Sequence, residues 1–107
     1  MATEIKKIQI MGNTWVIYED DLNNPMLASC DGFTLTHQRT IMLREKEYMD
    51  ESGSNEDVYN HILRHELVHA IAFECGLDRH LGHDEMLVDW IAHISPILES
   101  LVDGVLK

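Results

Sequence analysis

The sequence predicts an α+β fold in which a small antiparallel or mixed sheet packs against two main helices. Short runs rich in β-branched and aromatic residues occupy residues 5–44. Apolar residues then recur at helical spacing through residues 58–101. The length of 107 residues suits one modest core, so we expect residues 1–107 to form a single domain. The order of the strands cannot be read from these patterns.

Two pairs of strands are expected in the first half of the chain. Residues 5–18 contain two β-rich runs separated by Gly12 and Asn13, which tolerate the positive φ angles of tight hairpin turns. A second pair is expected within residues 33–43, where apolar residues alternate on both sides of a polar bend. The alternating residues are Phe33, Leu35, Ile41 and Leu43.

Two helices are expected in the second half. Ser54 and Asp57 resemble a helix-capping arrangement, and Gly76 can supply the left-handed residue that closes the same helix. The second helix is expected to start near Asp84 and to be kinked or broken at Pro96, because proline lacks the backbone N–H of a helical hydrogen bond.

Composition and charge exclude several classes of function. The formal net charge of −11 argues against nonspecific binding to nucleic acid and against an anionic membrane surface. We find no apolar run long enough for a signal peptide or for a bilayer-crossing helix, so we expect a cytoplasmic protein with neither nucleic-acid nor membrane partners. Cys30 and Cys75 lack the spacing of a metal knuckle, and we expect no disulfide between them.

The most informative motif is HELVH at residues 65–69. Residues four apart stand one above the other on a helix, so His65 and His69 can direct two imidazoles at one metal ion while Glu66 lies beside it. Zinc binds imidazole nitrogen and leaves a position for water in catalytic sites, and a neighbouring carboxylate can take the water's proton. In the alternative, both histidines are ordinary helix residues, but a metal better satisfies two polar rings on a largely apolar face.

A third ligand is expected from residues 80–90. The candidates are His80, His83, Asp84, Glu85 and Asp89. Glu85 and Asp89 are four residues apart, so one helical face could offer a carboxylate to the metal and a second carboxylate to the other ring nitrogen of a ligating histidine. The alternative, acidic residues that favour a helix N-terminus, explains Asp84 and Glu85 but not Asp89.

The segments HELVHAIAFECGL and DEMLVDW together resemble the gluzincins, thermolysin-like metallopeptidases with HExxH and a downstream ExxxD. The resemblance implies His65, His69 and Glu85 as zinc ligands, Glu66 as general base and Asp89 as the residue that orients a ligand. Residues 60–96 are more similar to small phage- and prophage-encoded zincins related to ImmA/IrrE-type metallopeptidases, with a weaker likeness in residues 31–45. This implies a minimal zincin-like fold.

These features lead to a hypothesis of a zinc-dependent metallopeptidase that hydrolyses a peptide or protein substrate, with Glu66 as general base. The strand expected at Thr40–Arg44 is our candidate for the sheet edge that binds the substrate. Among residues that could stabilise a developing negative charge we favour His83. The other candidates are His80, His93, Tyr48 and Tyr59.

Two other functions remain open. The chain could be a catalytically silent zincin-fold phage protein that acts as a protein-binding module, because 107 residues leave little wall for a substrate cleft. The charge alone also motivates an acidic mimic of nucleic acid. The intact Glu66 favours the enzyme over both. The oligomeric state cannot be read from the sequence.

Overall fold

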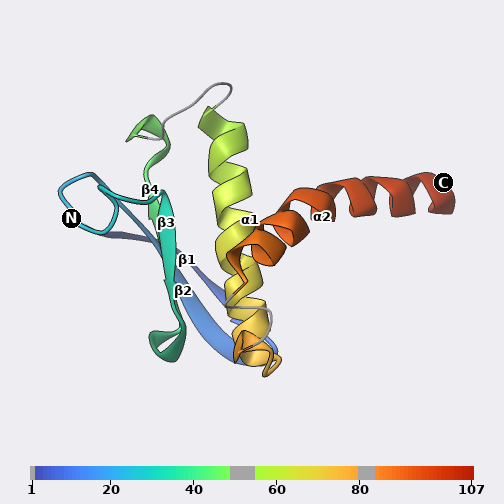
Figure 1. The fold of residues 1–107 in the computed structure, drawn as a ribbon, viewed down its shortest axis with the longest axis horizontal. Coiled ribbons are helices and arrows are strands. Elements are labelled where there is room, and N and C mark those ends of the chain that lie inside the picture. The colour runs from blue at the N-terminus through green and yellow to red at the C-terminus, as the bar shows by residue number, and fades with distance from the viewer. Residues whose placement is uncertain (1, 49–54, 80–83) are drawn as a thin grey trace.

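The computed structural model describes residues 2–48, 55–79 and 84–107, and within them a four-stranded sheet precedes two long helices (Figure 1). The strands are β1 (Thr3–Ile10), β2 (Asn13–Asp20), β3 (Gly32–Leu35) and β4 (Thr40–Arg44). The helices are α1 (Asn55–Glu74) and α2 (Glu85–Leu106). Two short 3-10 helices, η1 (Thr36–Gln38) and η2 (Lys46–Tyr48), flank β4. The predicted α+β class is confirmed.

The sheet is mixed, with the strand order β1-β2-β4-β3. β1 pairs with β2, and β3 with β4, in antiparallel fashion, whereas β2 and β4 run parallel. The expectation that Thr40–Arg44 forms the edge beside the site is therefore wrong, because this strand has a neighbour on each side. The edge on that side of the sheet is β3.

The first hairpin turns one residue earlier than predicted. Met11 and Gly12, with φ angles of 51° and 85°, are its two central residues, and Ile10 faces Asn13 across the turn. Two consecutive positive φ angles are the geometry of a tight two-residue hairpin. Asn13 therefore belongs to β2 and not to the turn.

The core lies between the sheet and α1. Trp15, Ile41 and Leu43 from the sheet are fully buried, and Tyr59 and Ala70 from α1 are buried against them. The burial of these side chains supplies the main force that holds the helix on the sheet.

A glycine allows α1 to approach the edge strand closely. Gly32 pairs with Leu43 and Thr34 pairs with Ile41, so both β3 residues share the face that carries the core. A Cβ on Gly32 would lie 3.1 Å from Ile62 Cγ2, which is too close without a shift of the helix side chain. Phe33 and Leu35 pair with Met42 and Thr40, so they point to the opposite face from Ile41.

The end of α1 is fixed by local and long-range contacts. Gly76 has a φ angle of 76°, its N–H donates to the Phe73 carbonyl, and the N–H of Leu77 donates to the Ala72 carbonyl. This is the hydrogen-bond pattern of a glycine-closed helix, as the sequence predicted. At the other end α1 begins at Asn55, and the expected cap Ser54 lies outside the described residues.

A buried carboxylate links the end of α1 to the sheet. Glu74 has a side chain only 4% exposed, and it accepts hydrogen bonds from Trp15 Nε1 at 2.9 Å and from Arg39 Nε at 2.9 Å. Arg39 and then Trp15 lower the pKa of the Glu74 carboxyl below its usual range. The ionised form of Glu74 is therefore favoured in the folded protein.

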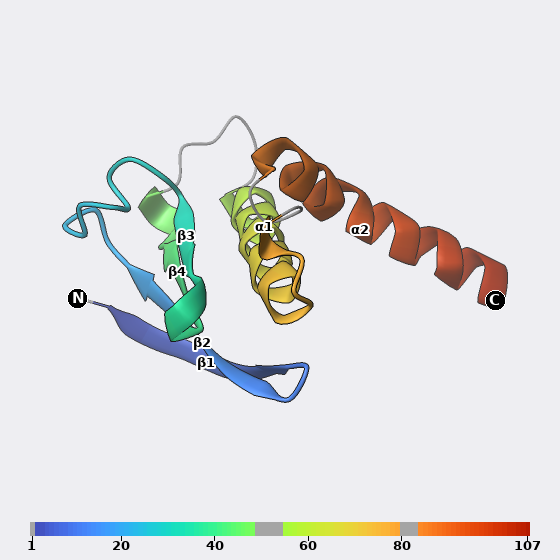
Figure 2. The ribbon, with the colours of Figure 1, turned by 60° about the horizontal axis from the view of Figure 1, so that its bottom comes forward.

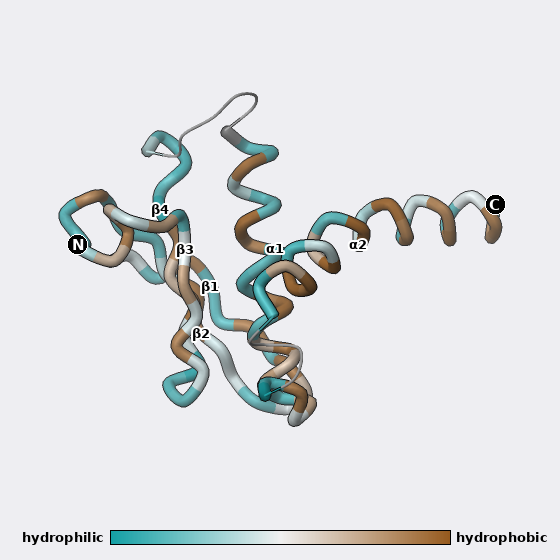
Figure 3. The backbone as a smooth tube through the Cα atoms, viewed as in Figure 1, coloured by the Kyte–Doolittle hydropathy of each residue, from teal (hydrophilic) through white to brown (hydrophobic). Residues whose placement is uncertain are grey.

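The second helix packs on the first one and then extends away from the rest of the molecule (Figures 1 and 2). It begins at Glu85, near Asp84 as predicted, and Oδ1 of the N-cap residue Asp84 accepts a hydrogen bond from the Leu87 N–H at 3.0 Å. Val88 and Ala92 are its two buried residues, and apolar positions recur along its projecting part (Figure 3). α2 packs mainly against α1.

The helix does not end at Pro96 but runs on to Leu106. The Ser95 hydroxyl donates to the Ile91 carbonyl at 2.6 Å, which supports the turn that the proline disturbs.

Neither described helix combines the length and apolar character that crossing a bilayer requires.

Candidate metal centre

The α-helical periodicity of α1 places His65 and His69 side by side. Their ring centroids lie 5.1 Å apart, and both rings are partly buried. Both histidines contact Glu85 at the start of α2, and α2 packs on α1 (Figure 1). This packing brings a third side chain, from the first turn of α2, to the same point.

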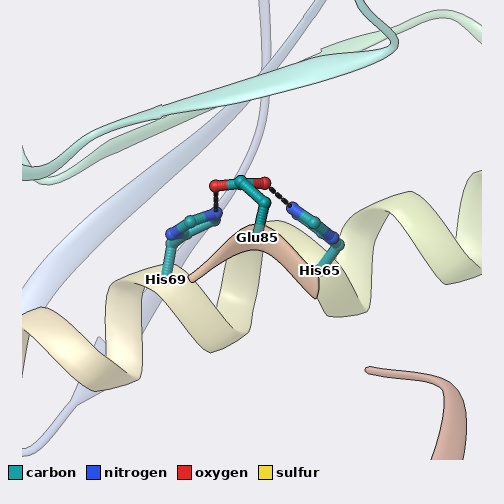
Figure 4. Close-up of side chains that lie close together, drawn as sticks. All are labelled: His65, His69 and Glu85. Atoms are coloured by element: carbon teal, nitrogen blue, oxygen red, sulfur yellow. Dashed lines mark hydrogen bonds and ion pairs between the residues drawn. The ribbon is translucent and has the colours of Figure 1, made fainter. Parts of the chain in front are cut away.

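That third side chain is Glu85, whose carboxylate lies between the two histidines (Figure 4). Glu85 Oε2 is 2.8 Å from His65 Nε2, and Glu85 Oε1 is 2.8 Å from His69 Nε2. One possible ligand atom from each residue lies within 4.8 Å of the others, and no other such group occurs in the described ranges. The three ligands predicted from sequence are therefore brought together by two helices.

Asp89 approaches the outer side of the same cluster, one turn after Glu85. Asp89 Oδ1 is 3.2 Å from His65 Nδ1, while Nε2 of that ring faces Glu85. The two ring nitrogens of His65 are thus matched to two carboxylates, which fixes the orientation of the imidazole. The sequence predicted this arrangement from the spacing of the two acids.

His61 is a member of the site that sequence reasoning missed. Its Nε2 lies 2.7 Å from Asp89 Oδ1, so His61 and His65 share one carboxylate oxygen. The hydrogen bond with His61, followed by that with His65, lowers the pKa of the Asp89 carboxyl. Its position one turn before His65 was the only available signal, and it gave no reason to expect a shared acceptor.

Glu66 lies in the same pocket but is held from the other side, by the sheet. Its side chain is buried, with the residue 6% exposed, and its Oε1 accepts a hydrogen bond from the Thr34 hydroxyl at 2.8 Å. Burial raises the pKa of the Glu66 carboxyl above its usual range, and the Thr34 hydroxyl with His65 and His69 opposes this shift. Thr34 therefore orients the carboxylate and favours its ionised form.

A pocket of about 440 Å³ opens beside these residues. Its lining comes from β3 and the chain around it, and from the facing sides of α1 and α2. The polar lining residues include Thr34, Glu66, Glu85 and Asp89. A group bound near the histidines would therefore meet the edge strand on one side and Glu66 on another.

Three of the residues considered for stabilising a negative charge belong to the described ranges, and none of these three is found in this lining. Tyr48, Tyr59 and His93 do not line the pocket, and the hydroxyl of Tyr59 donates instead to Glu19. The favoured candidate His83, like His80, lies outside the described residues. The role of His83 thus stays a prediction.

The donor set fits a zinc ion. Two imidazole nitrogens and one carboxylate oxygen are the ligands that three-ligand zinc sites use, with distances of about 2.0–2.2 Å once a metal is bound. Each of the two nitrogens faces the Glu85 carboxylate, so the three donors converge without a change in helix packing. The partly open pocket leaves room for a further ligand.

No protein-family model matches the chain, and comparisons with curated proteins and with solved structures find no match either.

Proposed function

We propose that the protein is a zinc-dependent metallopeptidase of the gluzincin type, with a minimal zincin-like domain. The observation that carries the proposal is the convergence of His65, His69 and Glu85 beside a buried carboxylate, Glu66, in an open pocket. A purely structural zinc site has four protein ligands and no use for an adjacent carboxylate. Three ligands with a nearby base are the composition of a hydrolytic site.

The proposed division of work follows from the contacts. His65, His69 and Glu85 would hold the zinc ion, and Asp89 orients His65. A bound zinc ion would lower the pKa of water toward neutrality and polarise a peptide carbonyl. Glu66 accepts a proton from the attacking water and later gives it to the leaving amine, because its carboxylate is fixed by Thr34 at the pocket wall.

The substrate is proposed to bind along β3. This strand is at the end of the sheet and borders the pocket, so its outer backbone groups are available to an extended peptide. β3 takes the role that the sequence suggested for β4. Recognition through backbone groups needs no particular side chains and suits a broad range of peptide or protein substrates.

Glu66→Gln separates the peptidase from a metal-binding protein without activity. The amide keeps the size of the side chain and its acceptor for Thr34 but cannot take a proton. We expect normal zinc binding and a loss of cleavage of at least about 100-fold. The assay is digestion of a peptide library by the zinc-loaded parent and variant.

Two results would count against the proposal. Equal cleavage by parent and Glu66→Gln would mean that Glu66 is not the base or that a contaminant cleaves the peptides. Zinc binding without cleavage by either protein would favour a catalytically silent zincin-fold phage protein that binds other proteins.

A further inference from the structure

The part of α2 that extends beyond α1 has no partner within the described residues. Every residue from Ser95 to Lys107 is exposed. Several of them are large and apolar: Leu98 is 58% exposed, Leu101 64% and Val105 83%. Figure 3 shows these apolar positions as brown bands along the projecting helix. Such a row of exposed apolar side chains is typical of an interaction surface.

The apolar residues of α2 follow a heptad pattern. Along the helix, steps of four and three residues alternate, which places six apolar side chains on one narrow face. We call this face the α2 seam. It consists of Leu87, Ile91, Ile94, Leu98, Leu101 and Val105. These residues form two sets, each with a spacing of seven. Ile91, Leu98 and Val105 form one set, and Leu87, Ile94 and Leu101 form the other.

The α2 seam carries no charge, although the chain has a formal net charge of −11. At 3.6 residues per turn, Asp89, Glu99 and Asp103 project to the other side of the helix. Pro96 also lies opposite the seam, so the missing backbone N–H does not interrupt it. Two copies of α2 can therefore meet along their seams without opposing carboxylates.

The projecting segment also needs a partner for its own stability. Isolated helices shorter than about 12–15 residues are marginal in water, and the part of α2 after Pro96 has no packing to support it. Burial of the seam would supply that support, since each leucine removed from water contributes about 1.5–3 kcal/mol.

We propose that the α2 seam is a self-association surface on which a second copy of this chain packs its own α2. The heptad spacing and the absence of charge on the seam favour an identical helix. α2 contains no lysine or arginine between Glu85 and Leu106, so an anionic bilayer surface is not a suitable occupant. This inference is independent of the proposed peptidase activity, because no residue of the α2 seam lines the pocket beside the histidines.

Sedimentation velocity of the 107-residue chain tests the proposal. We expect the parent to form a dimer as its concentration is raised to several hundred micromolar. Leu98→Glu places a charge in the seam of both copies, and we expect it to raise the dimer dissociation constant by at least about 100-fold. Ser100→Glu is the matched control, because it adds the same charge on the polar side of the same exposed segment and should leave the dimer intact.

Three outcomes would overturn the proposal: a parent that stays monomeric, a Leu98→Glu variant that dimerises as well as the parent, and a Ser100→Glu variant that loses the dimer equally. A monomeric parent would mean that a different protein, and not a second copy of this chain, covers the α2 seam. Zinc affinity, measured on the same samples, shows that each variant keeps the first half of α2 folded. A variant with a lost dimer and an unchanged zinc affinity supports the seam.

Discussion

Replacing Thr34 with valine tests whether the edge strand holds the proposed base. Valine has nearly the shape of threonine and is at least as favourable in a strand, so the substitution removes one hydroxyl and leaves no cavity. Glu66 is 6% exposed and accepts the Thr34 hydroxyl at 2.8 Å. Loss of that donor leaves the buried Glu66 carboxyl without the hydrogen bond that favours its ionised form.

The expected magnitude follows from the energy of a hydrogen bond to a charged group, about 1.5–3 kcal/mol. We expect zinc-free Thr34→Val to lose about this much unfolding free energy at pH 7.5, where an ionised Glu66 needs the donor. The loss should be smaller below pH 4.5, the ordinary pKa of this group, because a protonated Glu66 makes only a neutral hydrogen bond. Turnover of a cleaved peptide should fall by about 10- to 100-fold with little change in zinc affinity.

Urea unfolding at the two pH values is the assay, with Thr40→Val as the matched control. The Thr40 hydroxyl donates to the Gln38 carbonyl at 3.1 Å, away from the pocket. If Thr34→Val has the same unfolding free energy as Thr40→Val at both pH values, the Thr34 hydroxyl does not support Glu66. Thr34 would then not orient the Glu66 carboxylate.

Three further predictions use the same chain. Asp89→Asn should weaken zinc binding by roughly one to two orders of magnitude in a chelator competition, because the amide is a poorer acceptor for His65, while His37→Ala should bind zinc like the parent. Glu74→Gln should unfold at a lower temperature than the parent at pH 7. That difference should shrink as the pH falls below 4.5, since the stabilising effect of a lowered carboxyl pKa is lost on protonation. Zinc-free Glu66→Gln should be more stable than the parent at pH 7.5 and lose this advantage below pH 4.5, because burial disfavours the ionised carboxylate.

The ligand cluster was accessible from sequence because its parts are local. His65 and His69 share one helical face, and Glu85 and Asp89 share another, so each pair follows from helical periodicity alone. Zinc binds both imidazole and carboxylate ligands, so the histidine pair and the acidic pair were expected to lie at one site. The packing of α2 on α1 through Val88 and Ala92, which brings them together, had no separate signal.

The arrangement of the sheet could not be predicted, since alternation identifies strands but not their neighbours. The parallel pairing of β2 with β4 encloses Thr40–Arg44 and leaves β3 at the edge. Thr34 was missed for the same reason. Its partner Glu66 is distant in sequence, and a threonine between two apolar residues looks like an ordinary strand residue.

The end of α2 departs from the local rule for proline. Proline disfavours helix interiors, and the sequence predicted a kink or a break at Pro96. The helix nevertheless continues to Leu106, with the Ser95 hydroxyl bonded to the preceding turn. The heptad pattern across Pro96 is consistent with one continuous helix.

Zinc titration of the metal-free chain against a competing chelator measures whether His65, His69 and Glu85 form a metal site. We expect one zinc ion per chain and a severe loss of affinity in His65→Ala, His69→Ala and Glu85→Ala. Absence of zinc binding by the parent would mean that His65 and His69 are ordinary helix residues and not metal ligands. Parent-like affinity of Glu85→Ala would contradict the site as drawn here, because the carboxylate between the two imidazoles would then not be a ligand.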